Sequence, residues 1–97
     1  MSDAAFNQVF QNVRSKWFQL AKVTAVRDAF NNTANYFSTY QTRQLLGQIT
    51  SETNRLELAK ASYRNVVDKI SFSQLYDLFS SQAHRDELDR YVRSYRY

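Results

Sequence analysis

The sequence contains no cysteine and no proline, and it has one glycine, Gly47, among its 97 residues. Without cysteine, disulfide bonds and thiolate metal sites are excluded. Sharp hairpins and multi-strand sheets depend on glycine and proline in their turns, whereas α-helices are weakened by both residues. The scarcity of these residues therefore favours a helical protein before any periodicity is considered.

Long apolar runs are also lacking. No segment approaches the roughly 18 apolar residues that indicate a membrane-spanning helix. The first residues, Met1-Ser2-Asp3-Ala4, have neither the basic start nor the apolar stretch of a signal peptide. We therefore expect a soluble chain, or a segment cut from a longer protein whose export signal lies elsewhere. The length suits one core, so we expect a single domain over residues 3–95.

The formal net charge of +4 is compatible with an anionic partner, but charge describes solubility and steering before it describes function. Basic residues gather near the end of the chain, where Asp86 and Asp89 precede Arg90 and Arg93 by four positions. This spacing places opposite charges on one helical face. We expect an ion-paired, solvated face there.

Two short motifs recur three times in the same order. The first is Gln8-Val9-Phe10, Gln44-Leu45-Leu46 and Gln74-Leu75-Tyr76, and each copy is closed three positions later by an apolar residue, Val13, Ile49 or Phe79. The second is clearest in residues 54–60, which include Arg55, Glu57 and Leu58, with weaker copies in 17–22 and in 84–90, which include Arg85, Glu87 and Leu88. The alignment matches Gln19 with Glu57 and Glu87. One helix pair cannot bury its apolar stripe alone, so the pattern predicts three stacked helical hairpins in an all-α domain.

Apolar residues at the i, i+3, i+4, i+7 spacing predict six short helices, covering about 3–14, 16–30, 38–49, 52–65, 71–79 and 82–95. In the second helix, Leu20, Val23, Val26 and Phe30 are expected to point inward, with Trp17 packed at its start. Ser38 before Gln41 and Ser71 before Gln74 have the spacing of capping boxes. Leu58 is assigned to the core.

Several aromatic and basic residues fall at loops, helix ends or the terminus, where tyrosine and arginine are typical of protein interfaces. These candidates for an interaction surface are Trp17, Tyr36, Tyr40, Arg93, Tyr95, Arg96 and Tyr97. The carboxyl-terminal members are also suited to stacking on single-stranded nucleic acid. Partial packing with a frayed tail is the alternative explanation of that end.

A catalytic or metal site finds little support. His84 is the only histidine, and no cysteine or second histidine completes a zinc set, so we expect an exposed or capping residue. Glu57 and Glu87 recur with Arg55 and Arg85, which indicates a repeated hydrogen bond or salt bridge between adjacent hairpins. No phosphate-binding loop, dinucleotide fingerprint or nucleophile elbow is present. We predict no catalytic residue, cofactor or metal.

The order of several short motifs resembles the family called domain of unknown function 4476. The motifs are Tyr36-Phe37-Ser38-Thr39-Tyr40-Gln41, Leu45-Leu46, residues 54–63, Val66-Val67-Asp68, Leu78-Phe79-Ser80 and Arg85-Asp86-Glu87-Leu88. The resemblance covers about residues 5–95. It implies a compact helical domain, often at the carboxyl end of exported bacterial proteins, especially in Bacteroidetes, and hence a periplasmic or secreted location if an export signal precedes it. It implies no activity. The basic and aromatic stretch 14–18 and Arg64 depart from the family pattern.

Three functions remain open on this sequence. The first hypothesis is a non-enzymatic interaction module that contacts another protein or the remainder of a longer parent chain. The second is nucleic-acid binding through the carboxyl-terminal Arg and Tyr residues, which would weaken steeply with salt. The third is an enzyme whose polar pocket the sequence does not display.

Overall fold

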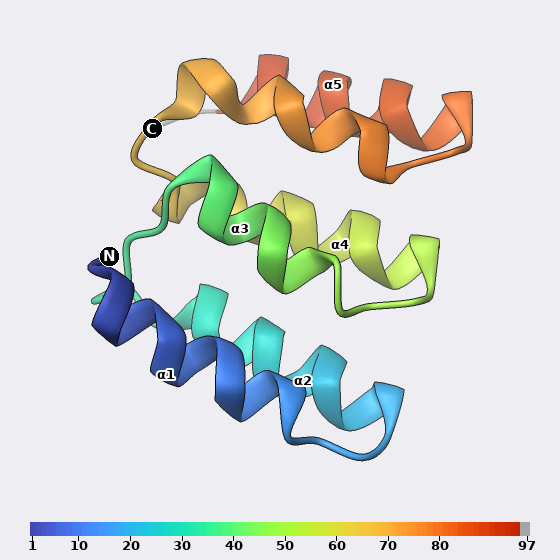
Figure 1. Cartoon of the computed structure of the whole chain (residues 1–97). Coiled ribbons are helices and arrows are strands. Elements are labelled where there is room, and N and C mark those ends of the chain that lie inside the picture. The colour runs from blue at the N-terminus through green and yellow to red at the C-terminus, as the bar shows by residue number, and fades with distance from the viewer. Residues whose placement is uncertain (96–97) are drawn as a thin grey trace.

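The computed structural model describes residues 1–95 and confirms an all-α fold (Figure 1). The elements in chain order are α1 (Asp3–Arg14), α2 (Gln19–Asn31), α3 (Thr39–Leu46), α4 (Glu52–Ser62), the 3-10 helices η1 (Tyr63–Asn65) and η2 (Lys69–Leu78), and α5 (Gln82–Ser94). Among the helices of residues 1–95, none has the length and apolar content that a bilayer crossing needs.

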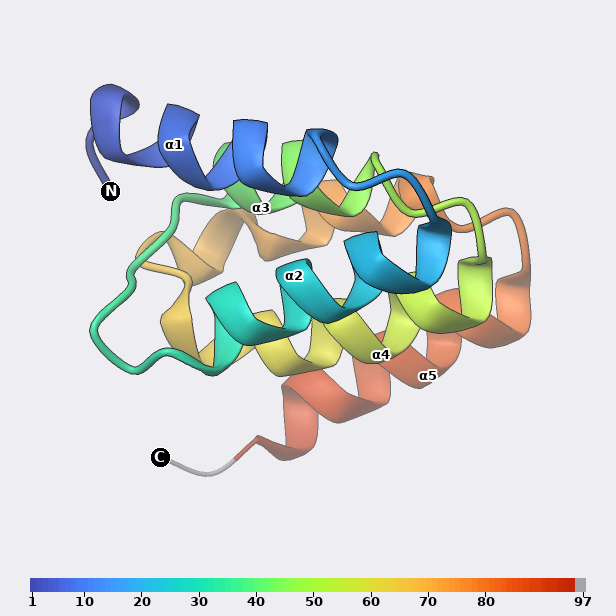
Figure 2. The ribbon, with the colours of Figure 1, turned by 90° about the horizontal axis from the view of Figure 1, so that it is seen from below.

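Consecutive helices form three antiparallel hairpins that stack in two layers (Figures 1 and 2). One layer contains α1, α3 and η2, and the other contains α2, α4 and α5. The middle helix α4 therefore has a helix on either side. The turns within the three hairpins lie at one end of the molecule, the turn end, while the two connectors between hairpins lie at the opposite end, the connector end (Figure 1).

The recurring apolar residues of the first motif build the core. Val13, Ile49 and Phe79 are buried, as are Leu45 and Leu75. In the second motif, Leu58 and Leu88 are buried. The assignment of these positions to the inside of the fold is confirmed.

Gln19 joins the first hairpin to the second at the turn end. Its side-chain oxygen accepts a hydrogen bond from the Thr50 backbone N–H at 3.0 Å, and its side-chain amide donates to the Gln48 carbonyl at 3.2 Å. Both bonds are made to backbone groups of the turn between α3 and α4.

Arg55 makes the corresponding link from the second hairpin to the third. Its guanidinium donates to the Leu78 carbonyl, and also to the Ile49 carbonyl at 2.7 Å within its own hairpin. Gln19 and Arg55 thus hold equivalent places in successive hairpins. In this role Gln19 corresponds to Arg55, two residues before Glu57, with which the motif alignment matches it.

The beginning of α2 differs from the prediction. The helix starts at Gln19 and not at about Lys16, and Phe18 is its N-cap residue. The Trp17 side chain is 93% exposed and that of Leu20 is 76% exposed, so their predicted packing is wrong. Because Gln19 faces the second hairpin, Leu20 is rotated about 100° around the helix and faces solvent. The other predicted inward residues of α2 are buried: Val23, Val26 and Phe30.

One of the two predicted capping boxes is present. The Ser38 hydroxyl accepts from the Gln41 backbone N–H at 3.1 Å, and the Gln41 side chain accepts from the Ser38 backbone N–H at 3.0 Å. This reciprocal pair starts α3 as predicted.

The capping box predicted at Ser71 is absent from the described chain, because the helix begins earlier, at Lys69, and is a 3-10 helix. Asp68 precedes it and binds α3 instead. Its carboxylate accepts from the Thr39 backbone N–H at 2.7 Å and from the Thr39 hydroxyl at 3.0 Å. The connector is thereby fixed before Ser71 is reached.

The hairpin turns are formed without special backbone conformations. No residue in 1–95 has a positive φ, and Gly47 ends α3 with a φ of −63°. Serine caps start the helices that follow the second and third turns. The Ser51 hydroxyl accepts from the Asn54 N–H, and the Ser81 hydroxyl accepts from the His84 N–H, both at 3.3 Å.

Candidate functional site

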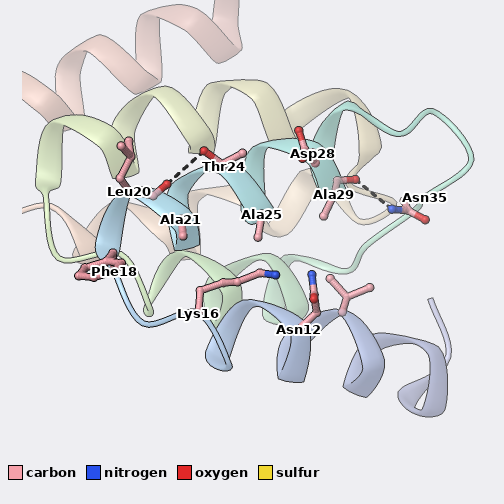
Figure 3. A pocket seen from close by; sticks show the side chains of 11 residues that line it. Asn12, Lys16, Phe18, Leu20, Ala21, Thr24, Ala25, Asp28, Ala29 and Asn35 are labelled. Carbon is pink, nitrogen blue, oxygen red and sulfur yellow. Dashed lines mark hydrogen bonds between the residues drawn. The ribbon is translucent and has the colours of Figure 1, made fainter.

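An open groove of about 760 Å³ lies between α1 and α2, on the outer side of the first hairpin (Figure 3). Three alanines at four-residue spacing, Ala21, Ala25 and Ala29, line its α2 side, because residues four apart share one helical face. Their small side chains leave the hollow between the helices. Val9, Phe18 and Leu20 complete the apolar lining.

The groove also has polar lining residues: Asn12, Lys16, Thr24, Asp28 and Asn35. Figure 3 shows the Asn12 amide pointing from α1 toward α2, and the Lys16 side chain, from the turn after α1, lying in the groove between the two helices. Asn35 at the connector end donates to the Ala29 carbonyl at 3.0 Å. Within residues 1–95 the ammonium of Lys16 has neither a hydrogen bond nor an ion pair. The lining also contains one carboxylate, that of Asp28, which points away from Lys16 (Figure 3).

Large apolar side chains stand exposed where the groove meets the turn end. Trp17 is 93% exposed, and Phe18 and Leu20, which line the groove, are 74% and 76% exposed. We call these three residues the turn-end cluster. Exposed aromatic and aliphatic side chains gathered beside a groove are typical of binding surfaces, whereas single exposed apolar residues are common on any protein.

The predicted interaction residues do not form one surface. Trp17 is in the α1–α2 turn, whereas Tyr36 is in the connector at the opposite end of the molecule (Figure 1). Tyr36 is 57% exposed, and Tyr40, at the start of α3, is 68% exposed. The prediction located exposed aromatic residues but did not separate the two ends.

The carboxyl-terminal candidates are engaged within the domain. Arg93 binds the Asp89 carboxylate at 2.7 Å, which confirms that predicted ion pair. The Tyr95 ring packs edge-on against Tyr63, with ring centroids 5.0 Å apart. Arg96 and Tyr97 lie outside the described residues.

Asp89 also ties α5 to η2. The Tyr76 hydroxyl donates to its carboxylate at 3.2 Å. Burial of the ring, together with the negative charge of Asp89, raises the pKa of Tyr76 to about 12. Both features favour the neutral phenol as a hydrogen-bond donor, so this contact serves the packing of the third hairpin.

Glu52 is the most strongly perturbed acid among the described residues. Its carboxylate accepts from the backbone N–H groups of Ser80 at 2.6 Å and Ser81 at 3.3 Å, and lies 2.5 Å from the His84 Nδ1 atom. The Ser80 hydrogen bond is the largest cause, and the His84 contact the next, of a pKa of Glu52 lowered to about 2. The carboxylate therefore joins α4 to the positive end of α5.

His84 is half-buried and paired, in place of the exposed or capping residue that was predicted. Serine, histidine and glutamate meet here, but the Ser80 hydroxyl donates to Glu52 at 3.0 Å. A nucleophilic serine needs its hydrogen bond to the base. The arrangement is a link between hairpins.

The repeated glutamates pair differently from the prediction. Both approach one lysine, since Lys60 forms a salt bridge to Glu87 on α5 and lies 3.7 Å from Glu57. The Lys60 hydrogen bond lowers the pKa of Glu87. Burial alone would lower the pKa of Lys60, but the Glu87 hydrogen bond and the two nearby carboxylates raise it. An ion pair between adjacent hairpins is present.

The arginines predicted to join those ion pairs bind carbonyl oxygens. Arg85 donates to the Phe79 carbonyl at 2.5 Å and to the Gln82 side chain at 2.8 Å, both within the third hairpin. Arg55 binds carbonyls of two hairpins, as described above. Arg85 therefore stabilises the turn of its own hairpin, and Arg55 links adjacent hairpins.

No group of three or more histidine, aspartate or glutamate side chains placed to hold a metal ion occurs within residues 1–95. The apolar groove is the feature that sequence reasoning missed. Its signal was the four-residue spacing of Ala21, Ala25 and Ala29 together with Lys16, but alanine favours any helix position, so this spacing alone does not identify a groove.

The family described as Domain of unknown function (DUF4476) matches residues 1–92 of the chain. The match covers almost the whole domain described above and agrees with the resemblance found in the motifs. No curated protein and no solved structure matches the chain.

Proposed function

The chain belongs to the family described as Domain of unknown function (DUF4476), and because that description carries no activity, we propose a function from the exposed surface. The protein is a non-enzymatic helical interaction module that binds a protein partner, or the remainder of a longer parent chain, through the outer face of its first hairpin. The observation that supports this proposal is the turn-end cluster beside the α1–α2 groove. A periplasmic or extracellular location, if an export signal precedes this segment, belongs to the same proposal.

The organisation of the stack supports this choice. In stacked helical repeats the terminal repeats normally present a polar outer face. On the third hairpin, α5 follows that rule, since its exposed residues include Gln82, Asp86 and Arg90, although Ile70 on η2 is exposed. The first hairpin breaks it with an apolar groove. Exposed apolar side chains gathered on one face are expected where another protein covers that face.

Nucleic-acid binding ranks second. Its candidate residues Arg93 and Tyr95 already bind Asp89 and Tyr63, which leaves fewer groups for phosphates and bases. This hypothesis predicts binding at low salt that weakens steeply as salt rises. Fluorescence anisotropy with labelled single- and double-stranded oligonucleotides tests it, and the absence of binding at low salt removes it.

The principal test is a pull-down from native extract followed by mass spectrometry. It compares the unaltered protein with Leu20→Glu, which places a charge in the turn-end cluster. Ile70→Glu is the matched control, because Ile70 is 96% exposed and belongs to η2, outside the first hairpin. We expect partners that bind the unaltered protein and the control but not Leu20→Glu.

Three results contradict the proposal. The first is partner recovery that the Leu20→Glu variant retains in full. The second is turnover of a substrate in a hydrolase screen without any recovered partner. The third is sedimentation with anionic lipid vesicles that Leu20→Glu abolishes, since the exposed face would then be a membrane contact.

A further inference from the structure

We propose that the α1–α2 groove binds one amphipathic α-helix of the partner, with its apolar stripe on the three alanines and an acidic residue against Lys16. This inference rests on the proposed function and specifies the chemistry of the partner. It names an occupant that has an internal precedent in the same fold.

The precedent is the second hairpin, whose corresponding face is covered by the first hairpin, with α2 packed on α4 and α1 on α3. At the sequence offset that relates Gln19 to Arg55, the groove residues Asp28 and Ala29 correspond to Arg64 and Asn65. Arg64 donates to the Asn31 side-chain oxygen at 3.2 Å, and Asn65 donates to the Phe30 carbonyl at 2.5 Å. The groove lies on the corresponding side of the first hairpin, the side that faces away from the second hairpin.

The helix that fills the precedent shows what such a face accepts. α2 packs against α4 through Val23, Val26 and Phe30, which are 3%, 0% and 0% exposed. Their spacing of three and four residues is that of one helical face. A helix placed on the first hairpin in the same manner would insert side chains of this size above the alanines.

The dimensions of the groove suit one helix. It runs along α2, a helix of 13 residues, which corresponds to about 20 Å at 1.5 Å per residue. Amphipathic helices that lie in such grooves contact them through residues at i, i+3, i+4 and i+7. Alanines on the receiving helix allow close approach, and the turn-end cluster extends the apolar contact beyond the hollow.

Charge determines which helix fits. The Lys22 ammonium, on α2, donates a hydrogen bond to the Arg14 carbonyl at 3.1 Å and is already paired. Lys16 is not engaged within residues 1–95 and lies in the groove, whereas Asp28, the acidic residue of the lining, points away from it (Figure 3). A partner that covers an unpaired ammonium must supply an acceptor, because burying the charge alone is costly. A glutamate or aspartate beside the apolar stripe provides it.

A second copy of this chain is a poorer occupant. Its own stripe of this spacing, Val23, Val26 and Phe30, is buried in its own core. The exposed residues of α1 and α5 are mainly polar. The copy would have to unfold a hairpin to present the required surface.

The test uses a defined probe, a fluorescein-labelled synthetic helix of about 14 residues, or ~21 Å. It carries Val, Val and Phe at the spacing of the α2 stripe, two glutamates beside them and alanine elsewhere. A second probe replaces both glutamates with lysine. Fluorescence anisotropy measures the Kd of each probe for the unaltered protein and for Ala25→Gln, Lys16→Glu and the control Ile70→Gln.

We expect saturable binding of the glutamate probe. Ala25→Gln fills the hollow and should raise its Kd about tenfold, equivalent to ~1.4 kcal/mol, while Ile70→Gln leaves it unchanged. Lys16→Glu should reverse the preference between the two probes. Circular dichroism verifies that the variants retain their helices, and glutamine at position 25 is compatible with a helix.

The inference is overturned if the glutamate probe does not saturate, or if Ala25→Gln and Ile70→Gln bind it equally. Equal Kd values for the two probes with the unaltered protein overturn the acidic partner. A dimer in sedimentation velocity that Ala25→Gln dissociates assigns the groove to a second copy. Partners lost with Leu20→Glu, combined with a probe that fails, leave the proposed function standing and remove only the helical mode.

Discussion

The two outer faces of the stack are built differently, although the hairpins beneath them carry related motifs. On the third hairpin, exposed side chains of α5 bind one another, and Gln82 donates to Asp86 at 2.7 Å. On the first hairpin, α2 presents Ala25 and an unpaired Lys16 stands across the groove from it. A polar face that satisfies its own hydrogen bonds needs no partner. The first hairpin thus presents the more open outer face, and the third hairpin the more closed one.

The core does not depend on the difference between the two outer faces. The largest change in the free energy of unfolding is expected there. Leu58 is 1% exposed on the middle helix, so Leu58→Ala removes packing atoms and leaves a cavity. We expect a loss of about 2 to 5 kcal/mol in the free energy of unfolding. Urea denaturation measures it, with Arg93→Ala as the exposed comparison. Similar small losses in both variants would contradict the assigned core.

A smaller effect distinguishes the inner interface from the closed end. Arg55 binds carbonyls in two hairpins, whereas Arg85 binds groups of its own hairpin. Arg55→Ala leaves partly buried carbonyls unsatisfied and should cost roughly 1 to 3 kcal/mol. Arg85→Ala should cost less. If the order in chemical denaturation is reversed, Arg55 is not the link between the second and third hairpins.

Acid should weaken the junction of the second and third hairpins. The folded pKa of Glu52, about 2, lies below its ordinary value of 4.5. A depressed carboxyl pKa contributes stability that is present above pH ~4.5 and is lost as the pH falls toward ~2. Glu52→Gln should therefore flatten the decline of the melting temperature over this window. Asp86→Asn is the control, and an equal flattening there would assign the effect to net charge.

The smallest effect on stability is expected at the open face. Leu20→Glu alters an exposed side chain and should change the free energy of unfolding by no more than about 0.5 kcal/mol. The same change should reduce the fluorescence of a hydrophobic dye that binds exposed apolar surface. A large loss of stability would mean that Leu20 packs in solution, and the contrast between the two outer faces would then disappear.

The periodicity of the sequence predicted the parts of the fold that depend on residues close together in the chain. The first helix, residues 3–14, and the capping box of Ser38 and Gln41 were predicted with their observed bounds. Both depend on residues within one turn of each other. The buried positions Leu45, Leu75 and Leu58 followed from the repeated motifs.

The predictions were wrong where a hydrogen bond to a distant segment overrides the local sequence pattern. Leu20 continues the apolar period of α2, but Gln19 binds the second hairpin and turns Leu20 outward. Ser71 has the spacing of a cap, but Asp68 is held by Thr39 and the helix begins earlier. The groove escaped prediction because its shape depends on how α1 lies beside α2.

The hairpin turns contain no residue that relies on left-handed backbone within the described chain. Gly47 has the torsion angles of an ordinary residue, and a methyl group there would meet carbonyl oxygens at normal contact distances of 3.4 and 3.5 Å. The second and third turns are instead held by the Ser51 and Ser81 hydroxyls and the Glu52 carboxylate. A homologous domain is free to lose its glycine altogether and keep this architecture, provided that the serines which start its helices remain.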